Sequence, residues 1–225
     1  MDESQREELR RRYLAVDTSN VADVLDELEL PDQGLAAAFR PFPAGAGKLA
    51  GWAFTIAGES APYASDGGDP AKMEACARLT PGSVSVWSGK GEGVCFFGEL
   101  ISIGMRERGC AGALVDGGVR DVRFIGELGF PVYARYRTPV QSIGRWRVTG
   151  SGIPVPLPGA TVPEVTVTPD DFILGDEDGV ILIPASVAER VLERAETLGK
   201  REVEIRAELA RGLSLSEALA RFGHV

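Results

Sequence analysis

The 225-residue sequence predicts an α/β protein in which a mixed sheet packs against helices. Three observations support this fold class. The middle of the chain alternates apolar, β-forming runs with segments of helical spacing, as strand–helix–strand units do. Residues 141–184 change to short strands separated by turn residues. The chain then continues into a long amphipathic segment, which predicts a C-terminal helix packed on the sheet or on another subunit.

The first part of the chain is expected to contain three helices and two strands. The helices cover residues 2–16, 17–28 and 69–79, and the strands cover residues 48–59 and 83–87. Thr18 or Ser19 is the expected N-cap of the second helix, and Asp69 caps the third with Pro70 in its first turn. Glycine and proline predict irregular connections over residues 30–47, 61–69 and 88–93.

The second part begins with alternating helices and strands. Helical spacing covers residues 95–109, a buried strand covers residues 110–116, a helix follows to residue 129, and a strand covers residues 130–136. Short strands are expected over residues 146–149, 153–157, 164–168 and 179–184, with a tight turn at residues 175–179. A long helix covers residues 185–212, and Ser214 or Ser216 caps a short last helix.

Composition excludes several classes of function. The formal net charge of −9 disfavours direct binding of nucleic acid, whose phosphates repel an acidic surface. No apolar run approaches the roughly 20 residues of a membrane span, and the charged N-terminus does not resemble a secretory signal. The three cysteines are an odd number without CxxC spacing, which indicates a reducing compartment. We therefore expect a cytoplasmic protein without a membrane partner.

The available side chains restrict the chemistry further. His224 is the one histidine, close to the end of the chain, so histidine-based triads and zinc motifs are excluded. No lysine lies in an apolar stretch of sequence that would lower its pKa, which disfavours a Schiff-base mechanism. Any reaction must therefore use carboxylates, arginine, backbone amides or a hard metal ion.

The segment ALVDGGVRD, residues 113–121, is the most informative one. A buried strand is followed by an expected turn at residues 117–118, and a helix is expected to start near Val119. Arg120 and Asp121 then lie in the first helical turn, at the carboxyl end of a strand, where open α/β sheets bind ligands. The helix dipole adds affinity for anions at this place.

A second glycine-rich segment, residues 89–100, precedes it. If Gly98 opens a helix, the N–H groups of Glu99, Leu100 and Ile101 are unpaired and can hold a carboxylate. The same helix leads directly into the strand of the first segment. We therefore hypothesise that the two helix starts converge on one anion pocket.

These features also have structural interpretations. An arginine–aspartate pair in a first helical turn is usually a cap or a surface ion pair, and Glu99 is a favourable charge at a helix start. Asp116 fits a turn-forming residue better than a ligand, and residues 176–178 lack the spacing of an EF-hand loop. The glycine-rich stretches at residues 44–51 and 89–93 lack the spacing of nucleotide-binding loops.

The central signature of the RraA-like family closely resembles GELISIGMRERGCAGALVDGGVRDVRFIGELGFPVYAR in this chain. This family includes the regulator of ribonuclease E activity A and the 4-hydroxy-4-methyl-2-oxoglutarate/4-carboxy-4-hydroxy-2-oxoadipate aldolases. The resemblance extends to DTSNVADVLDEL, LTPGSVSVW and PDDFILGDEDGVILIP. It implies one swivelling β/β/α-type domain over residues 1–225, with an N-terminal helical segment (1–30) and C-terminal helices (185–225). It also implies homotrimers or homohexamers with active sites near the subunit boundaries.

The resemblance further implies roles for individual residues. As in the aldolases, Arg120 would bind the keto and carboxylate oxygens of a small 2-oxo acid, and Asp121 would hold Mg²⁺ or Mn²⁺, partly through water. Glu99, after the helix-opening Gly98, would orient a water for proton transfer, and the amides of Leu100 and Ile101 would bind the pyruvyl carboxylate. Retro-aldol cleavage without a Schiff base needs such a guanidinium and Lewis acid for the enolate, and hard oxygen ligands suit these ions.

One departure from the aldolase pattern concerns the metal site. The aldolases carry an acidic residue three positions after the aspartate of the pair, where this chain has Phe124, and Glu127 lies one helical turn further on. We therefore carry three hypotheses forward. The first is a metal-dependent aldolase or oxaloacetate decarboxylase that releases pyruvate. The second is a non-catalytic regulator that binds and inhibits an RNA-processing enzyme, and the third is a lyase or hydratase acting on a sugar acid.

Overall fold

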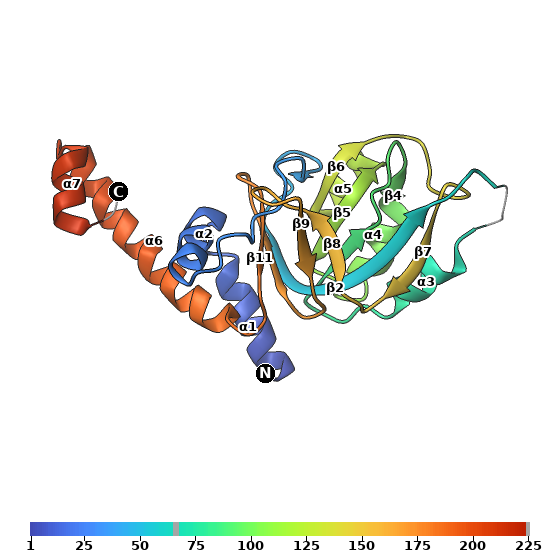
Figure 1. Cartoon of the computed structure of the whole chain (residues 1–225), viewed down its shortest axis with the longest axis horizontal. Coiled ribbons are helices and arrows are strands. Elements are labelled where there is room, and N and C mark those ends of the chain that lie inside the picture. The colour runs from blue at the N-terminus through green and yellow to red at the C-terminus, as the bar shows by residue number, and fades with distance from the viewer. Residues whose placement is uncertain (65–67, 224–225) are drawn as a thin grey trace.

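The computed structural model describes residues 1–64 and 68–223, and its centre is a curled mixed sheet (Figure 1). Within the described residues, nine strands form this sheet in the order β1-β6-β5-β3-β2-β10-β11, while β4 pairs with β5 and β7 pairs with β2. The strands are β1 (Arg40–Pro41), β2 (Leu49–Ser60), β3 (Ser83–Ser88), β4 (Cys95–Phe97), β5 (Gly112–Val119), β6 (Val132–Arg137), β7 (Trp146–Ser151), β10 (Phe172–Gly175) and β11 (Val180–Ile183).

The sheet is parallel at its centre and antiparallel at its margins. β2, β3, β5 and β6 run parallel to one another, and β4 runs parallel to β5. β1, β7, β10 and β11 join in antiparallel directions. Every residue of β3 and β5 is buried, as expected for central strands covered on both faces. The predicted fold class, α/β with a mixed sheet, is therefore confirmed.

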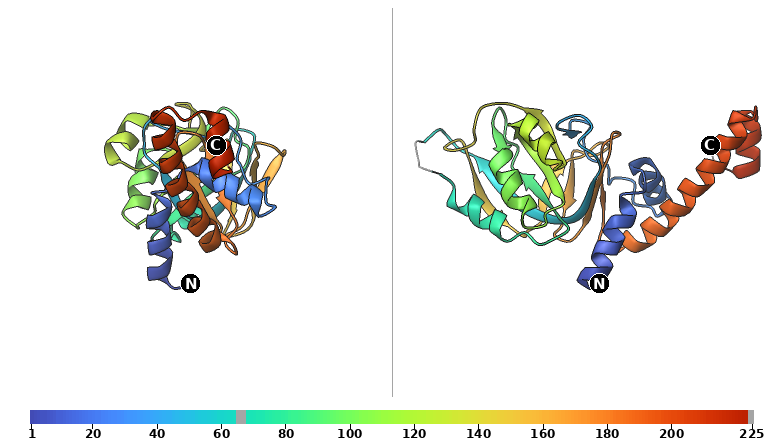
Figure 2. Two further views of the ribbon diagram at one scale, coloured as in Figure 1. Left: turned by 90° about the vertical axis from the view of Figure 1, so that its left-hand side faces the viewer. Right: turned by 180° about the vertical axis from the view of Figure 1, so that it is seen from behind.

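Three helices cover one face of the sheet, as the view from behind shows (Figure 2). They are α3 (Pro70–Ala77), α4 (Glu99–Arg106) and α5 (Val122–Leu128). Their apolar sides meet the sheet in one core cluster with Trp87, Phe97 and Trp146. Asp69 caps α3 as predicted, because its carboxylate accepts a hydrogen bond from the backbone N–H of Lys72 at 3.1 Å.

The opposite face of the sheet is covered by a two-stranded antiparallel sheet of β8 (Val155–Pro158) and β9 (Glu164–Val167). Leu157 and Val167 from this pair are fully buried against Val86, Leu114 and Tyr133 of the large sheet. The sheet therefore has a core on each face, which fixes β5 and the segment that follows it.

Terminal helices form a third core with β2, β10 and β11 at one end of the molecule (Figures 1 and 2). The helices in this core are α1 (Glu3–Tyr13), α2 (Thr18–Glu27) and α6 (Ala188–Ala210), and α7 (Leu215–Phe222) follows α6 outside it. The first half of α6 packs on its own chain through Val191 and Leu192 and is joined to α1 by the Arg12–Glu196 ion pair of 2.7 Å. Its second half extends away from the sheet with α7 (Figure 1).

Two predicted caps have different outcomes. Ser214 caps α7 in a capping box with Glu217, as one of the two alternatives predicted. The prediction that Thr18 or Ser19 caps α2 is wrong, because Asp17 occupies the cap position. Thr18 is buried instead, and both its backbone N–H and its hydroxyl donate to the Asp176 carboxylate, at 2.8 and 2.7 Å.

The central segment differs from the prediction in two places. Residues 95–97 form a short strand rather than the start of a helix, because they pair in parallel with β5. The glycines at 117 and 118 lie inside β5, and α5 starts at Val122 rather than near Val119. A Cβ atom on Gly117 would lie 2.6 Å from the Phe96 ring, so glycine serves close packing here rather than a turn.

Other predicted elements agree with the structure within a few residues. The turn at residues 175–179 connects the antiparallel pair β10–β11, as predicted. Of the irregular segment predicted over residues 61–69, residues 65–67 lie outside the described part, as does His224. Among the described helices, none is both long and apolar enough to cross a bilayer.

Candidate functional site

The candidate site lies where β4 and β5 end side by side. The backbone N–H of Arg120, directly after β5, donates to the Phe97 carbonyl oxygen at the end of β4, with a distance of 3.0 Å. This bond holds the segment of Arg120 and Asp121 against the start of α4. Because both strands are parallel, their carboxyl ends share one edge of the sheet, where α/β proteins bind ligands.

Asp121 has an unusual backbone and an unusual role. It occupies the cap position of α5 in the left-handed conformation, with φ 59° and ψ 31°, and its side chain makes no cap to that helix. Its Oδ2 atom instead accepts the backbone N–H of Glu99 at 3.3 Å and lies 3.4 Å from Nε of Arg120. Arg120 and Asp121 therefore precede the helix, and the prediction that they lie in its first turn is wrong.

Gly98 allows this close approach. It is the N-cap residue of α4 in an extended conformation that any residue could adopt. A Cβ atom at this position would lie 2.7 Å from Oδ2 of Asp121 and 3.2 Å from Cγ of Arg120. Glycine is therefore required for space, since a side chain here would displace both charged residues.

The predicted site residues line one cavity of about 440 Å³. The two segments meet at this cavity, as hypothesised. One of them is the start of the helix α4, but the other, with Arg120 and Asp121, follows the end of the strand β5 and is not a helix start. The N–H of Glu99 is taken by Asp121, while those of Leu100 and Ile101 lie in the first turn of α4 and have no partner within the helix. The lining residues from the sequence analysis are Gly98, Glu99, Leu100, Ile101, Arg120 and Asp121.

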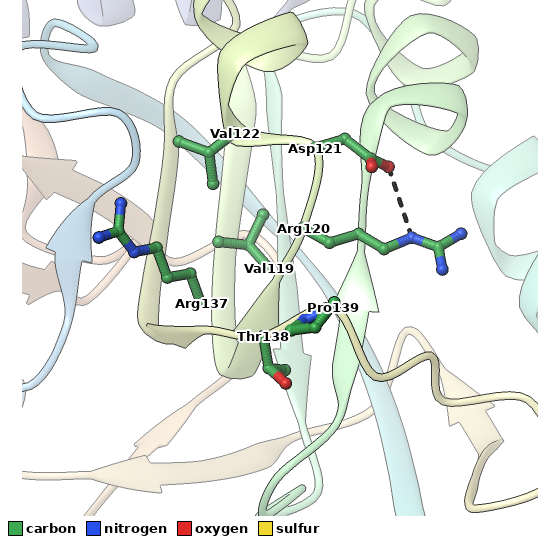
Figure 3. A pocket seen from close by; sticks show the side chains of 7 residues that line it. All are labelled: Val119, Arg120, Asp121, Val122, Arg137, Thr138 and Pro139. Carbon is green, nitrogen blue, oxygen red and sulfur yellow. Dashed lines mark ion pairs between the residues drawn. The ribbon is translucent and has the colours of Figure 1, made fainter.

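A second hollow, of about 530 Å³, lies on the other side of the same pair. Figure 3 shows that the side chains of Arg120 and Asp121 extend together to one side, while Arg137 extends to the other. The Arg120 and Asp121 side chains are 42% and 37% exposed, so both can reach a ligand from solvent. The lining residues of this hollow are Val119, Arg120, Asp121, Val122, Arg137, Thr138 and Pro139.

Lys72 is the cavity residue that sequence reasoning missed. It lies on α3 and is only 7% exposed. Its Nζ atom lies over the rings of Trp87 and Trp146, at 5.3 and 5.9 Å from the centroids. Burial lowers the pKa of Lys72 to about 8. The prediction that no lysine has a depressed pKa is wrong, because the apolar surroundings come from distant strands rather than from neighbouring residues.

The donor atoms around Asp121 can be compared with what a divalent cation needs. Its Oδ1 atom is left for a ligand, while Oδ2 is taken by the contacts described above. Among the described residues, no group of three or more His, Cys, Asp or Glu side chains could hold a metal. One carboxylate with Glu99 nearby fits a Mg²⁺ or Mn²⁺ ion that keeps most of its waters, and does not fit a cage of several protein carboxylates.

The residues after the pair do not add a ligand. Phe124 on α5 stacks under the guanidinium of Arg123, 4.4 Å from the ring centroid. Glu127 pairs with the same arginine at 3.8 Å, so its carboxylate is directed to the outer face of the helix. Glu127 therefore does not replace the acidic residue that the aldolase pattern has at the position of Phe124.

Asp116 has a structural role close to the site. It is fully buried, and its carboxylate accepts the backbone N–H of Lys90 at 3.0 Å and a guanidinium N–H of Arg135 at 3.2 Å. Burial raises the pKa of Asp116, and these two partners oppose the rise. Asp116 thus holds the loop of residues 88–93 against the sheet rather than contacting the cavity.

A family model and two curated relatives of this chain point to the same protein family. The model of the RraA-like family, described as Aldolase/RraA, matches residues 18–182. A Halalkalibacterium halodurans protein, provisionally named a 4-hydroxy-4-methyl-2-oxoglutarate aldolase, is 36% identical over 133 residues, which cover 58% of this chain and 60% of that protein. The 4-hydroxy-4-methyl-2-oxoglutarate aldolase of Thermus thermophilus is 39% identical over 79 residues, covering 35% of this chain and 44% of that protein.

A solved structure extends the likeness to nearly the whole chain. RraAS2 of Streptomyces coelicolor, described as an unusual member of the RNase ES inhibitor RraA protein family, matches with a TM-score of 0.76. The match covers 89% of this chain and 98% of that one at 24% identity, which shows a shared fold. The curated relatives, in contrast, are matched over 60% of their length or less.

Proposed function

Because the chain belongs to the RraA-like family, we propose that it is a divalent-metal-dependent lyase that cleaves a small 4-hydroxy-2-oxo acid or oxaloacetate and releases pyruvate. The observation that carries this proposal is the convergence of Arg120 and the start of α4 on one cavity. A guanidinium and free helix amides together suit the carboxylate and keto oxygens of a 2-oxo acid. The names of two relatives support the same substrate class.

In this mechanism Arg120 binds the keto oxygen and one carboxylate oxygen of the substrate. The N–H groups of Leu100 and Ile101 hold the carboxylate at the positive end of α4. When the C3–C4 bond breaks, its electron pair passes to C3 and the keto group, which gives the enolate of pyruvate. The fixed guanidinium of Arg120 stabilises the charge that develops on the keto oxygen.

Protons must move at two places. For a 4-hydroxy-2-oxo acid, the carboxylate of Glu99 receives the proton of the 4-hydroxyl group through a water molecule and later returns a proton to C3 of the enolate. For oxaloacetate, C4 leaves as carbon dioxide, and the proton that C3 of the enolate receives comes from solvent through the water molecule beside Glu99. Asp121 would hold Mg²⁺ or Mn²⁺, which supplies a Lewis acid for the same developing charge.

The test follows pyruvate release from oxaloacetate and from 4-hydroxy-4-methyl-2-oxoglutarate. The full-length protein is assayed with Mg²⁺, with Mn²⁺ and with excess chelator, beside Arg120→Ala and Asp121→Asn. We expect metal-dependent release that both variants reduce by a factor on the order of a hundred or more. Spontaneous decarboxylation of oxaloacetate by free metal is subtracted with a protein-free control.

Arg123→Ala is the matched control for the arginine variant. Arg123 is exposed on α5 and pairs with Glu127 outside the cavity, so its loss removes the same charge without affecting the site. The control should retain the wild-type rate. Folded protein that releases no pyruvate from either substrate under any metal condition contradicts the proposal, and so does activity that survives Arg120→Ala.

A second candidate function is supported by the surface beside the cavity. Leu100 and Phe124 are 80% and 38% exposed, and the acidic chain has a fold neighbour described as a ribonuclease inhibitor. These features suit a non-catalytic regulator that binds and inhibits an RNA-processing enzyme. A stable complex with ribonuclease E, lost in Leu100→Asp and retained in the exposed-site control Val203→Asp, would favour this function.

Self-association and location belong to the same proposal. We propose a homotrimer or homohexamer in the cytoplasm, where the three free thiols Cys76, Cys95 and Cys110 would stay reduced. Light scattering after size-exclusion chromatography distinguishes the two assemblies from the 23.9 kDa chain. A monomer at micromolar concentration would contradict this part of the proposal.

A further inference from the structure

We propose that Lys72 determines substrate specificity by binding a second carboxylate, so that the cavity prefers 2-oxo dicarboxylic acids to 2-oxo monocarboxylic acids. This inference rests on the proposed function for the 2-oxo acid, and it assigns a residue to the half of the substrate that Arg120 does not hold.

The ammonium group of Lys72 has two hydrogen-bond partners among the described residues. Its Nζ atom donates to the Phe96 carbonyl oxygen and to the Ser142 hydroxyl oxygen, the latter at 3.5 Å. An ammonium group has three N–H donors, so one remains for a ligand. Since Lys72, Phe96 and Ser142 all line the 440 Å³ cavity, the free donor is available on the side where a substrate binds.

Lys72 carries its positive charge in a buried position. Among the described residues, no carboxylate forms an ion pair with Lys72 within 4 Å. Asp69, an acidic residue at the start of the same helix, has one oxygen bonded to the backbone N–H of Lys72 at 3.1 Å and the other to that of Val148 at 2.9 Å. A buried cation without a paired anion is unfavourable, and a bound carboxylate would remove this cost.

The thiols near Lys72 do not supply the missing charge. Burial raises the pKa of Cys76 to about 11 and raises that of Cys95 as well, so both stay protonated at neutral pH. The two aromatic rings over Nζ stabilise a cation but carry no net charge. The remaining charged residues at the cavity are Arg120, Asp121 and Glu99.

Two cationic side chains lie at this cavity. Lys72 and Arg120 line the same cavity, and the positive charge of Arg120 helps to lower the pKa of Lys72. Arg120 already lies 3.4 Å from the Asp121 carboxylate, whereas no ion pair is formed by Lys72 among the described residues, so the second anionic group of a ligand would compensate chiefly Lys72. A 2-oxo acid with a second carboxylate has this group, while a monocarboxylic acid leaves Lys72 unpaired.

Binding of two stable ligands by isothermal titration calorimetry tests the inference. The ligands are 2-oxoglutarate and 2-oxopentanoate, which have the same number of carbon atoms and differ in the second carboxylate. They are titrated into the full-length protein with Mg²⁺ present. We expect the wild type to prefer the dicarboxylate by about tenfold or more, as for a charge-assisted hydrogen bond in a buried site.

Three variants separate the explanations. Lys72→Met keeps the volume and removes the charge, so it should abolish the preference while 2-oxopentanoate still binds. Lys90→Met removes the same charge from an exposed side chain paired with Glu164, and it should keep the preference. Arg120→Ala should weaken both ligands. Thermal unfolding of each variant shows that the fold is retained.

The experiments distinguish failure of the Lys72 inference from failure of the lyase proposal. A preference that persists in Lys72→Met overturns the inference, and so does the absence of any preference in the folded wild-type protein. If the preference depends on Lys72 but no pyruvate is released from any substrate, the inference stands and the lyase proposal fails. If pyruvate is released but Lys72→Met discriminates as the wild type does, the lyase proposal stands and the inference fails.

Discussion

The carboxylate of Asp121 accepts a hydrogen bond from the backbone N–H of Glu99, 3.3 Å away, across 22 positions of sequence. The bond joins the end of β5 to the start of α4. It also turns the Asp121 side chain away from α5, the helix that it precedes, and towards Arg120. Together with the contact to Arg120, this bond fixes the Asp121 carboxylate beside the start of α4 at the cavity.

Replacement of Gly98 by alanine should disturb the site without unfolding the protein. The new Cβ would lie 2.7 Å from Oδ2 of Asp121, so Asp121 and Arg120 must shift. Displacement of about 1 Å at a reacting group can reduce the rate roughly a hundredfold. We expect a loss of this order in pyruvate release, with a far-UV spectrum like that of the wild type.

Gly104→Ala is the matched control in the same helix. A Cβ at Gly104 meets no atom within 4 Å, and the residue is exposed. Alanine inside a helix should stabilise the protein by roughly 0.5–1 kcal/mol and leave activity unchanged. Equal activity in both variants would show that the space at Gly98 is not needed.

Lys72→Met should make the protein more stable at neutral pH. Burial lowers the pKa of Lys72 from 10.5 to about 8, so the folded state binds this proton more weakly than the unfolded state. The buried charge of Lys72 therefore lowers the free energy of unfolding by on the order of 3 kcal/mol, and this loss is fully present below pH 8. As the pH rises from 8 to 10.5, the unfolded state retains the proton longer, and the wild type gains stability.

Urea unfolding at several pH values measures this effect. The stability of Lys72→Met should exceed that of the wild type at pH 7.5, and the difference should shrink towards pH 10.5. Lys90→Met, on an exposed side chain, should show no such trend. A pH-independent difference between Lys72→Met and the wild type would mean that the charge of Lys72 is not the cause.

Asp176→Ala should destabilise the N-terminal region. The Asp176 carboxylate accepts the N–H and hydroxyl of Thr18 and the N–H of Asp178, so alanine leaves buried donors unpaired. We expect a loss of roughly 1–3 kcal/mol in the free energy of unfolding. Asp178→Ala removes an exposed carboxylate from the same turn and should change stability by no more than about 0.5 kcal/mol.

Arg135→Met should leave the fully buried Asp116 without its cation. Removal of one partner of a buried ion pair costs about 3 kcal/mol or more. Burial raises the pKa of Asp116 above 3.8, so its ionisation in the folded state destabilises the protein as the pH rises above that value. The loss in the free energy of unfolding of Arg135→Met should therefore be large at pH 7 and should diminish towards pH 4.

Chemical denaturation of the double variant Asp116→Asn with Arg135→Met checks this assignment. With no charge left to bury, the double variant should recover part of the lost stability at pH 7. Arg137→Met, on an exposed arginine of the same strand, should have little effect. A double variant less stable than Arg135→Met alone would contradict the assignment.

The sequence predicted most of the helices and strands and the neighbourhood of the site, but it did not predict the strands β1, β4 and β10. Helical spacing and β-forming runs are local signals, so α2, β2 and α6 were located within a few residues. The signature from Gly98 to Asp121 identified the segments that meet at the cavity. These predictions succeeded because short-range patterns determine both elements and their ends.

Three features escaped sequence reasoning for the same physical reason. Gly117 was assigned to a turn, although it lies inside β5 against the Phe96 ring. That contact arises only because β4 pairs with β5. Thr18 was assigned as a cap, although its partner Asp176 lies 158 positions away. Lys72 lies in no apolar stretch of sequence, so it was not expected to have a lowered pKa, although Trp87 and Trp146 from distant strands lie beside its Nζ atom. Each depends on contacts between distant segments that no local pattern records.

The two halves of α6 should differ in the free energy needed to break their backbone hydrogen bonds, because only the first half packs into the core. Most of the buried residues of α6 lie between Ala188 and Ala195, and Ile205 is the exception further along. Backbone amides of the first half can therefore exchange with deuterium only when the core of α1, α2 and β10 opens. The second half has fewer buried residues and contacts α2 through Glu202 and Asn20, so its amides should exchange through local fraying, and one continuous helix should show two protection levels.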